Sequence, residues 1–178
     1  NNPDTIAGLE KRLYTPLSNT LGAASCSGIF FGLNVTANTS LPNAEDFRAG
    51  LSLRYSGLQP TVASEQDVIC FRGAAETARS LQLQMHNRWN PELNAALIPG
   101  SDQVTAYQGA RLADGCLWTK RTELPDTWEQ VMLLCVPILD GGGTVRGFCG
   151  AEISDLYFSL SHNTVPSAFG NMLTLAAP

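Results

Sequence analysis

The chain has 178 residues, a length that suits one domain able to bury roughly 70% of its unfolded surface in a single core. Its 44% of apolar residues excludes an intrinsically disordered chain. The net charge is −5, and the 11 basic residues are scattered along the sequence, so they form no basic stripe for a phosphate backbone. We therefore expect no nucleic-acid partner.

The termini and hydropathy indicate a fragment of a longer protein. The chain starts on Asn1 rather than Met, and it stops abruptly at Pro178. The apolar run at 28–33 is far shorter than the roughly 20 residues that span a bilayer, and no signal-peptide pattern opens the chain. We expect any membrane attachment to come through segments outside this fragment.

The five cysteines have no CxxC pair and no spacing to histidine that suits zinc, so we expect no metal site. Their odd number excludes a complete set of disulfides within one chain. Two interpretations stay open: buried apolar thiols, or at least one disulfide in an oxidising compartment.

The first element expected is an amphipathic helix over about residues 4–24, with Asp4 as its N-cap. Its apolar side chains recur at steps of three and four residues. They are Ile6, Leu9, Leu13, Leu17 and Leu21. Pro16 lies inside this pattern and predicts a kink or a break.

Two antiparallel strands are expected next, over 28–35 and 49–55, because both runs are rich in β-formers or alternate apolar with polar residues. A short strand at 68–71 precedes a helix expected over 74–85 from its content of helix formers. Residues 87–102 are expected to be mostly loop, and 103–107 a brief strand.

Three β-like runs follow, at 116–122, 129–139 and 144–154, and they predict an antiparallel meander. The glycines at 141–143 favour a tight turn. A turn centred on Gly142 places Cys135 opposite Cys149. The strand pattern is expected to continue through Leu156 and Leu160. The fold class is therefore α+β, with a five-stranded antiparallel sheet and helices or loops packed on it.

The run Val136-Pro137-Ile138-Leu139-Asp140-Gly141-Gly142-Gly143-Thr144-Val145-Arg146-Gly147-Phe148-Cys149-Gly150-Ala151-Glu152-Ile153 resembles the closing hairpin of Cache domains, which are PAS-like extracytoplasmic sensor modules of bacterial membrane receptors. The resemblance implies one sensor domain over 1–178. Within it, the helix spans about 4–24, the sheet and pocket about 28–160, and a tail 161–178.

The resemblance also implies a function: binding of a small amino acid, carboxylate or similar molecule on the extracytoplasmic side, with occupancy relayed to a cytoplasmic output domain. It implies no cofactor. The amino-acid-binding subset of the family carries an Arg-x-Trp-Tyr run, whereas this chain has only Arg88-Trp89.

Eight side chains are candidates for ligand binding. His86, Arg88 and Trp89 follow the helix expected at 74–85 and bring an imidazole, a cation and an aromatic ring together. In the alternative interpretation, Trp89 fills the core and Arg88 caps the end of the helix. Arg72, at a strand-to-helix junction, suits a carboxylate, or is simply exposed. Trp118 and Lys120 are two residues apart in an expected strand, so they share a face of the sheet. The resemblance implies that Glu152 contacts amine groups of the ligand. The alternative is an ion pair between Lys120 and Glu152. The full set is Arg72, His86, Arg88, Trp89, Tyr107, Trp118, Lys120 and Glu152.

Catalytic patterns are missing from the sequence: it has no HExxH, no Gly-x-Ser-x-Gly and no phosphate loop. A Cys-His hydrolase using Cys149 or Cys26 with His86 has only weak support, so we expect no enzyme. Two hypotheses remain. The first is a ligand sensor, and the second is a ligand-free dimerisation or interaction module that pairs through Ile6, Leu9, Leu13 and Leu17.

Overall fold

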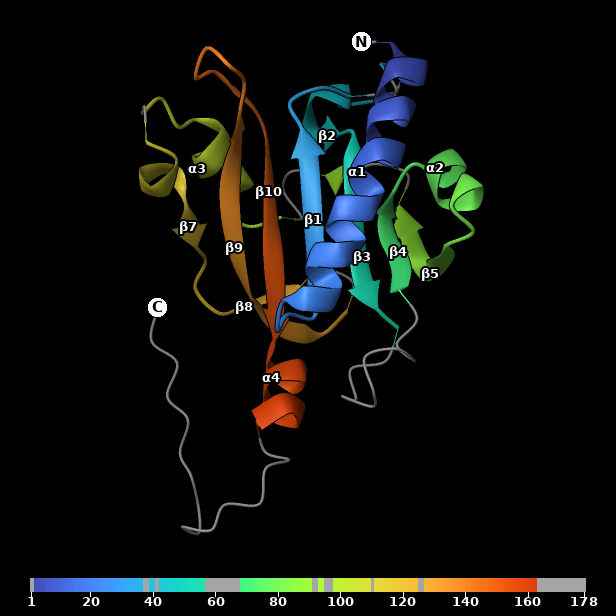
Figure 1. The fold of residues 1–178 in the computed structure, drawn as a ribbon, viewed down its shortest axis with the longest axis vertical. Coiled ribbons are helices and arrows are strands. Elements are labelled where there is room, and N and C mark those ends of the chain that lie inside the picture. The colour runs from blue at the N-terminus through green and yellow to red at the C-terminus, as the bar shows by residue number, and fades with distance from the viewer. Residues whose placement is uncertain are drawn as a thin grey trace, which may run out of the picture.

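The computed structural model describes residues 2–36, 39–40, 42–56, 68–90, 93–94, 98–109, 111–124 and 127–162; at 87–90, 94 and 161–162 it describes the backbone. The fold is α+β (Figure 1). The helices are α1 (Pro3–Ala23), α2 (Ala75–Ser80), α3 (Ser101–Thr105) and α4 (Asp155–His162), with short 3-10 turns η1 (Ala44–Asp46) and η3 (Leu112–Gly115). The strands are β1 (Gly28–Leu33), β2 (Phe47–Arg48), β3 (Gly50–Tyr55), β4 (Val68–Gly73), β5 (Gln84–Asn90), β6 (Leu93–Asn94), β7 (Leu117–Trp118), β8 (Thr122–Leu124), β9 (Glu129–Leu139) and β10 (Val145–Ser154).

The main sheet has eight strands among the described residues, in the order β5-β4-β3-β1-β10-β9-β7, with β8 also paired to β9. The expected five-stranded sheet is thus too small. Strands β4 and β5 extend it at one edge, and the run at 116–122 divides between β7 and β8. The pairing is antiparallel except between β4 and β5, which run parallel. β2 and β6 form a small separate ladder.

The N-terminal helix is confirmed, and its N-cap lies two residues earlier than expected. Asn2, rather than Asp4, is the N-cap: its Oδ1 accepts hydrogen bonds from the N–H groups of Asp4 (3.0 Å) and Thr5 (3.4 Å). Pro3 then occupies the first turn, where its missing N–H costs no helical hydrogen bond. The helix continues through Pro16 without the expected break.

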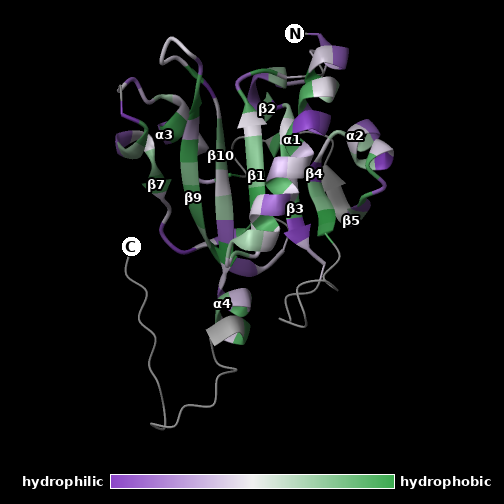
Figure 2. Ribbon diagram, viewed as in Figure 1, coloured by the Kyte–Doolittle hydropathy of each residue, from purple (hydrophilic) through white to green (hydrophobic). Residues whose placement is uncertain are grey.

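Apolar side chains pack on both faces of the sheet. Hydrophobic residues follow much of the length of its central strands (Figure 2). On one side, here called the α1 face, α1 packs over residues such as Phe31, Leu51 and Leu53. On the other side, the α3 face, Val104 of α3 and Leu93 of β6 pack against Phe30 and Phe148 among others. The alternation of β1 between Phe30 and Phe31 supplies both cores, as the period of a strand requires.

The segment after β4 departs most from expectation. The helix expected over 74–85 ends at Ser80, because Gln82 adopts a left-handed φ of 54° and the Leu83 N–H bonds back to the Ala78 carbonyl (2.9 Å). The chain then pairs with β4 as β5, so the expected loop after residue 87 begins as a strand. Pairing in the sheet thus outweighs the helix propensity of residues 81–85.

Two further local expectations were wrong. Residues 101–105 form α3 rather than a strand at 103–107, and this places Val104 in the core at 1% exposure. Residues 155–162 form α4 rather than more strand. The reason is local, since the Ser154 hydroxyl accepts the Tyr157 N–H (3.0 Å) and so caps a helix.

The hairpin of β9 and β10 is present, with a register that changes along its length. Val145 pairs with Leu139 as the turn centred on Gly142 predicts, but Gly147 pairs with Ile138, so Arg146 is an extra residue in a β-bulge. Beyond the bulge Cys149 lies opposite Val136, and Gly150 opposite Cys135. The expected pairing of Cys135 with Cys149 is therefore wrong, and the two side chains lie on opposite faces. All five cysteines are free thiols.

Candidate functional site

A polar cluster surrounds the ring of Phe71 on the α3 face of the sheet. Leu53 pairs with Cys70 and Ser52 with Arg72, so Phe71 is the extra residue of a bulge in β4. The Arg72 guanidinium lies 4.9 Å from the ring centroid and that of Arg54 lies 5.2 Å from it. The His86 ring lies at 4.7 Å between centroids. Two cations and an imidazole thus share one aromatic neighbour, and both arginines are buried.

Arg54 anchors the acidic side of this cluster. Its Nε donates to Glu152 Oε1 at 3.0 Å, and its Nη2 lies 2.7 Å from Glu129 Oε2. Burial acts to lower the pKa of Arg54, but the charges and hydrogen bonds of Glu152 and Glu129 outweigh it and raise that pKa above its usual value. The guanidinium is therefore a fixed positive charge, held by two carboxylates.

Glu152 is buried and pairs with Arg54, rather than with Lys120 as in the alternative to a ligand-binding role. Glu152 also accepts a hydrogen bond from the Ser27 hydroxyl at 2.7 Å. Lys120 is exposed and lines a separate hollow of about 540 Å³ with Arg121, Met132 and Asp155. Lys120 lies outside both strands, because the chain leaves β7 at Trp118 and makes an irregular turn before β8. The alternation of side chains along a strand therefore does not predict the direction of its side chain.

Trp118 also lies away from Glu152. It pairs with Leu134, which is opposite Ala151, so its side chain is on the α1 face while Glu152 is on the other. Its side chain is 46% exposed. Tyr107 is half-buried, and its hydroxyl donates to the Arg111 carbonyl (2.5 Å) within its own loop. Neither residue joins the polar cluster.

Of the eight expected site residues, Arg72 and His86 are brought together around Phe71, and Glu152 is linked to them through Arg54. Arg88 and Trp89 lie on the β5 backbone rather than in a loop, and their side chains lie outside the described part of the structure. Sequence reasoning missed Arg54. Its position in an alternating strand beside buried leucines was the available signal, because a charge there must face either solvent or a partner.

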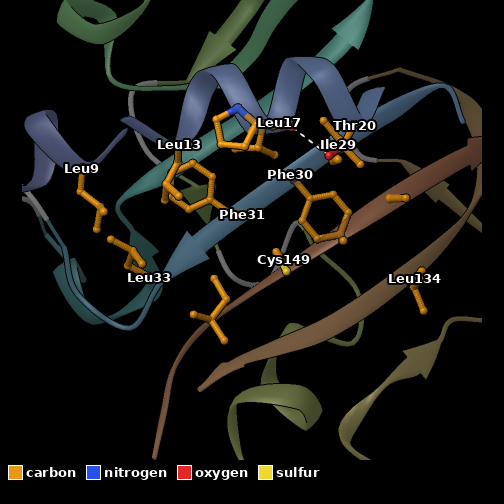
Figure 3. A pocket seen from close by; sticks show the side chains of 14 residues that line it. Leu9, Leu13, Leu17, Thr20, Ile29, Phe30, Phe31, Leu33, Leu134 and Cys149 are labelled. Carbon is orange, nitrogen blue, oxygen red and sulfur yellow. Dashed lines mark hydrogen bonds between the residues drawn. The ribbon is translucent and has the colours of Figure 1, made fainter. Parts of the chain in front are cut away.

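An apolar groove of about 620 Å³ lies on the α1 face, between α1 and the strands β1, β9 and β10 (Figure 3). Leu9, Leu13 and Leu17 line it from the helix. Leu134 and Ile138 line it from β9, and Cys149 and Ala151 from β10. These strand residues are only half-buried, because α1 crosses β1 and β3 and leaves the outer side of β9 uncovered. The candidate cluster and this groove therefore lie on opposite faces of one sheet.

Comparison of the chain with protein-family models, with curated proteins and with solved structures finds no match. In the part of the chain that the structure describes, no helix combines the length and the hydropathy needed to cross a membrane. Those same residues include no group of three or more His, Cys, Asp or Glu side chains placed to hold a metal ion.

Proposed function

We propose that this chain is the extracytoplasmic ligand-sensing domain of a bacterial signal-transduction receptor, and that it binds a small polar molecule carrying a carboxylate. The polar cluster on the α3 face carries the proposal. Arg72 is 1% exposed and lies beside Phe71, whose ring it shares with His86 and Arg54. Burial of charged groups costs stability, so a buried cluster of cations around one ring is a candidate site for an anionic ligand.

The residue types fit an anionic ligand. Arg54 is held by two carboxylates, and Arg72 and His86 bring a second guanidinium and an imidazole to the same Phe71 ring. A guanidinium presents a planar fork that matches a carboxylate, and an imidazole beside it adds a donor. The proposed ligand therefore places its carboxylate on Arg72.

A thermal-shift screen tests the proposal directly, because a ligand that binds only the folded state raises its melting temperature. The panel is amino acids, monocarboxylates and dicarboxylates. The hit is then titrated against Arg72→Lys, which keeps the charge and loses the fork, and His86→Asn. We expect at least tenfold weaker binding in both, and no change in Arg111→Lys, an exposed arginine elsewhere. The proposal fails if no carboxylate shifts the melting temperature, or if both variants bind as the parent does.

The apolar groove favours a second candidate, a ligand-free dimerisation module in which the α1 face pairs with a second copy. Ile6 is buried within its own domain, and Leu13 and Leu17 already pack on the sheet, so the helix stripe alone is not the contact. The half-buried residues of β9 would provide the rest. Sedimentation measurements of the oligomeric state separate the two candidates. This second function is supported if the chain is a dimer that Leu134→Lys dissociates and that Leu156→Lys leaves intact. Leu156 is 52% exposed on α4, outside the groove.

A further inference from the structure

The connection that follows α1 and the residue that precedes α4 meet at one buried hydroxyl, that of Ser27. Ser27 lies between α1 and β1 and is 0% exposed. Its Oγ donates to Glu152 Oε1 (2.7 Å) and accepts the backbone N–H of Ser154 (3.0 Å). Its own N–H donates to the Glu152 carbonyl (2.8 Å). The connection that follows α1 is thus fastened to the last residues of β10.

Ser154 continues the path into α4. Its hydroxyl accepts the Tyr157 N–H (3.0 Å), which is one of the N-terminal donors that a helix leaves without an internal partner. One serine therefore fixes the connection after α1, and the next serine along the path caps the start of α4. The two hydrogen bonds are joined through the Ser154 backbone, because the residue donates with its N–H and accepts with its side chain.

The same hydroxyl is joined to the candidate ligand cluster. Glu152 Oε1 accepts from both Ser27 Oγ and Arg54 Nε, and Arg54 lies over the Phe71 ring that Arg72 and His86 also contact. Buried polar groups connected in this way polarise one another, and moving one member leaves its neighbours without their partners. The path from the cluster to the connection after α1 and to the start of α4 is continuous in contacts that the structure shows.

We propose that Ser27 is a coupling residue: its hydroxyl ties the connection after α1 to the start of α4, so that a change at the Arg54–Glu152 pair alters the stability of both places together. The coupling itself is a property of the fold and needs no ligand. Its use in signalling rests on the proposed sensing function, in which α1 and α4 would carry occupancy out of the domain.

Hydrogen exchange measured by mass spectrometry tests the coupling in the whole chain without any ligand. In Ser27→Ala we expect amides of 20–27 and of 154–160 to exchange about tenfold faster, because buried groups lose their partner at both places. Ser154→Ala removes the cap alone, so only 154–160 should accelerate. Ser80→Ala is the matched control: its hydroxyl bonds the Thr77 carbonyl at the end of α2, away from both regions.

Faster exchange of 20–27 alone in Ser27→Ala, with 154–160 unchanged, would overturn the coupling. A uniform acceleration that includes β9 would also count against it, because that is global destabilisation. Should Ser27→Ala not fold, exchange of the unsubstituted chain in low urea answers the same question. The two helix ends should then open with one common free energy and urea dependence, and separate values would refute the proposal. Because no ligand is present, a failed ligand screen leaves this result untouched.

Discussion

Arg54 and Glu152 form an ion pair across the strand that separates them, with Nη2 2.9 Å from Oε1. The residue between them is Gly28 of β1, which pairs with Arg54 on one side and with Glu152 on the other. A Cβ at Gly28 would stand 3.0 Å from Arg54 Cγ and 3.4 Å from Glu152 Oε2. The missing side chain of Gly28 therefore leaves the space through which the two charges meet.

Glu152→Ala is expected to destabilise the fold by about 3 kcal/mol, because it leaves the buried Arg54 charge with Glu129 alone. Urea unfolding followed by circular dichroism measures the loss. Glu129→Ala is the matched control and should cost less, since Glu129 is 27% exposed and solvent compensates for its removal. The double variant Arg54→Met with Glu152→Leu should recover much of the stability, because apolar replacement removes the unpaired charge. An effect of Glu152→Ala no greater than that of Glu129→Ala would contradict the buried pair.

Gly28→Ala is expected to destabilise by about 1–3 kcal/mol, because the new methyl crowds Arg54 and the Leu53 carbonyl, each 3.0 Å away. Gly22→Ala offers an opposite control on α1, where the added Cβ has nothing within 4 Å. There the substitution should stabilise by about 0.5–1 kcal/mol through helix propensity. Thermal unfolding measures the melting temperature of both variants. A change of the same sign in Gly28→Ala and Gly22→Ala would contradict this expectation.

The hairpin illustrates how far sequence reasoning reaches. Turn chemistry located Asp140–Gly143 correctly, and the pairing of Val145 with Leu139 followed from it. The bulge at Arg146, whose side chain donates to Asp140 Oδ2 (2.8 Å), could not be read from the residues, because the glycine pattern of the turn predicts no change of register beyond it. One extra residue then moved Cys149 away from Cys135. A local signal fixes a turn, whereas register beyond it depends on contacts between side chains.

The candidate site was predictable only in part, for a related reason. Arg72 is a candidate because it lies at a strand-to-helix junction and His86 because it follows the expected helix, and the structure brings both to Phe71. Their meeting requires β5 to pair in parallel with β4, a long-range choice that the helix-rich residues 74–85 conceal. Glu152 was named too, but its partner Arg54 is 98 residues away. Pairings over that separation are set by topology rather than by local pattern.

Thiol reactivity should follow burial. Burial, and then the charge of Glu152, raises the pKa of Cys26 to about 11, and burial with the neighbouring Cys149 raises that of Cys135 to about 12. Only the thiolate attacks an alkylating reagent, so both should react very slowly at pH 7.5. Cys116 is exposed and should be labelled first by iodoacetamide. Peptide mass spectrometry gives the order, and equal labelling of all five in urea is the control. Rapid modification of Cys135 in the folded chain would place it elsewhere than the core.

Asp140 gives the hairpin a dependence on pH. Its Oδ1 accepts the N–H groups of Thr144 and Gly142, both at 2.9 Å, and its Oδ2 accepts from Arg146. These hydrogen bonds, that of Thr144 first and then that of Arg146, hold the pKa of Asp140 below its usual value despite a small opposing effect of desolvation. A carboxyl whose pKa is lower in the folded chain stabilises it fully above the unfolded pKa of about 3.9, and that contribution disappears as pH falls through the folded value.

Asp140→Asn should therefore lower the urea midpoint at pH 7. The difference in urea midpoint between this variant and the parent, here called the gap, should narrow below about pH 4. Asp114→Asn, at an exposed turn, supplies the comparison. A gap for Asp140→Asn that is as wide at pH 2.5 as at pH 7 would mean that neutral hydrogen bonds, rather than the charge, hold this turn.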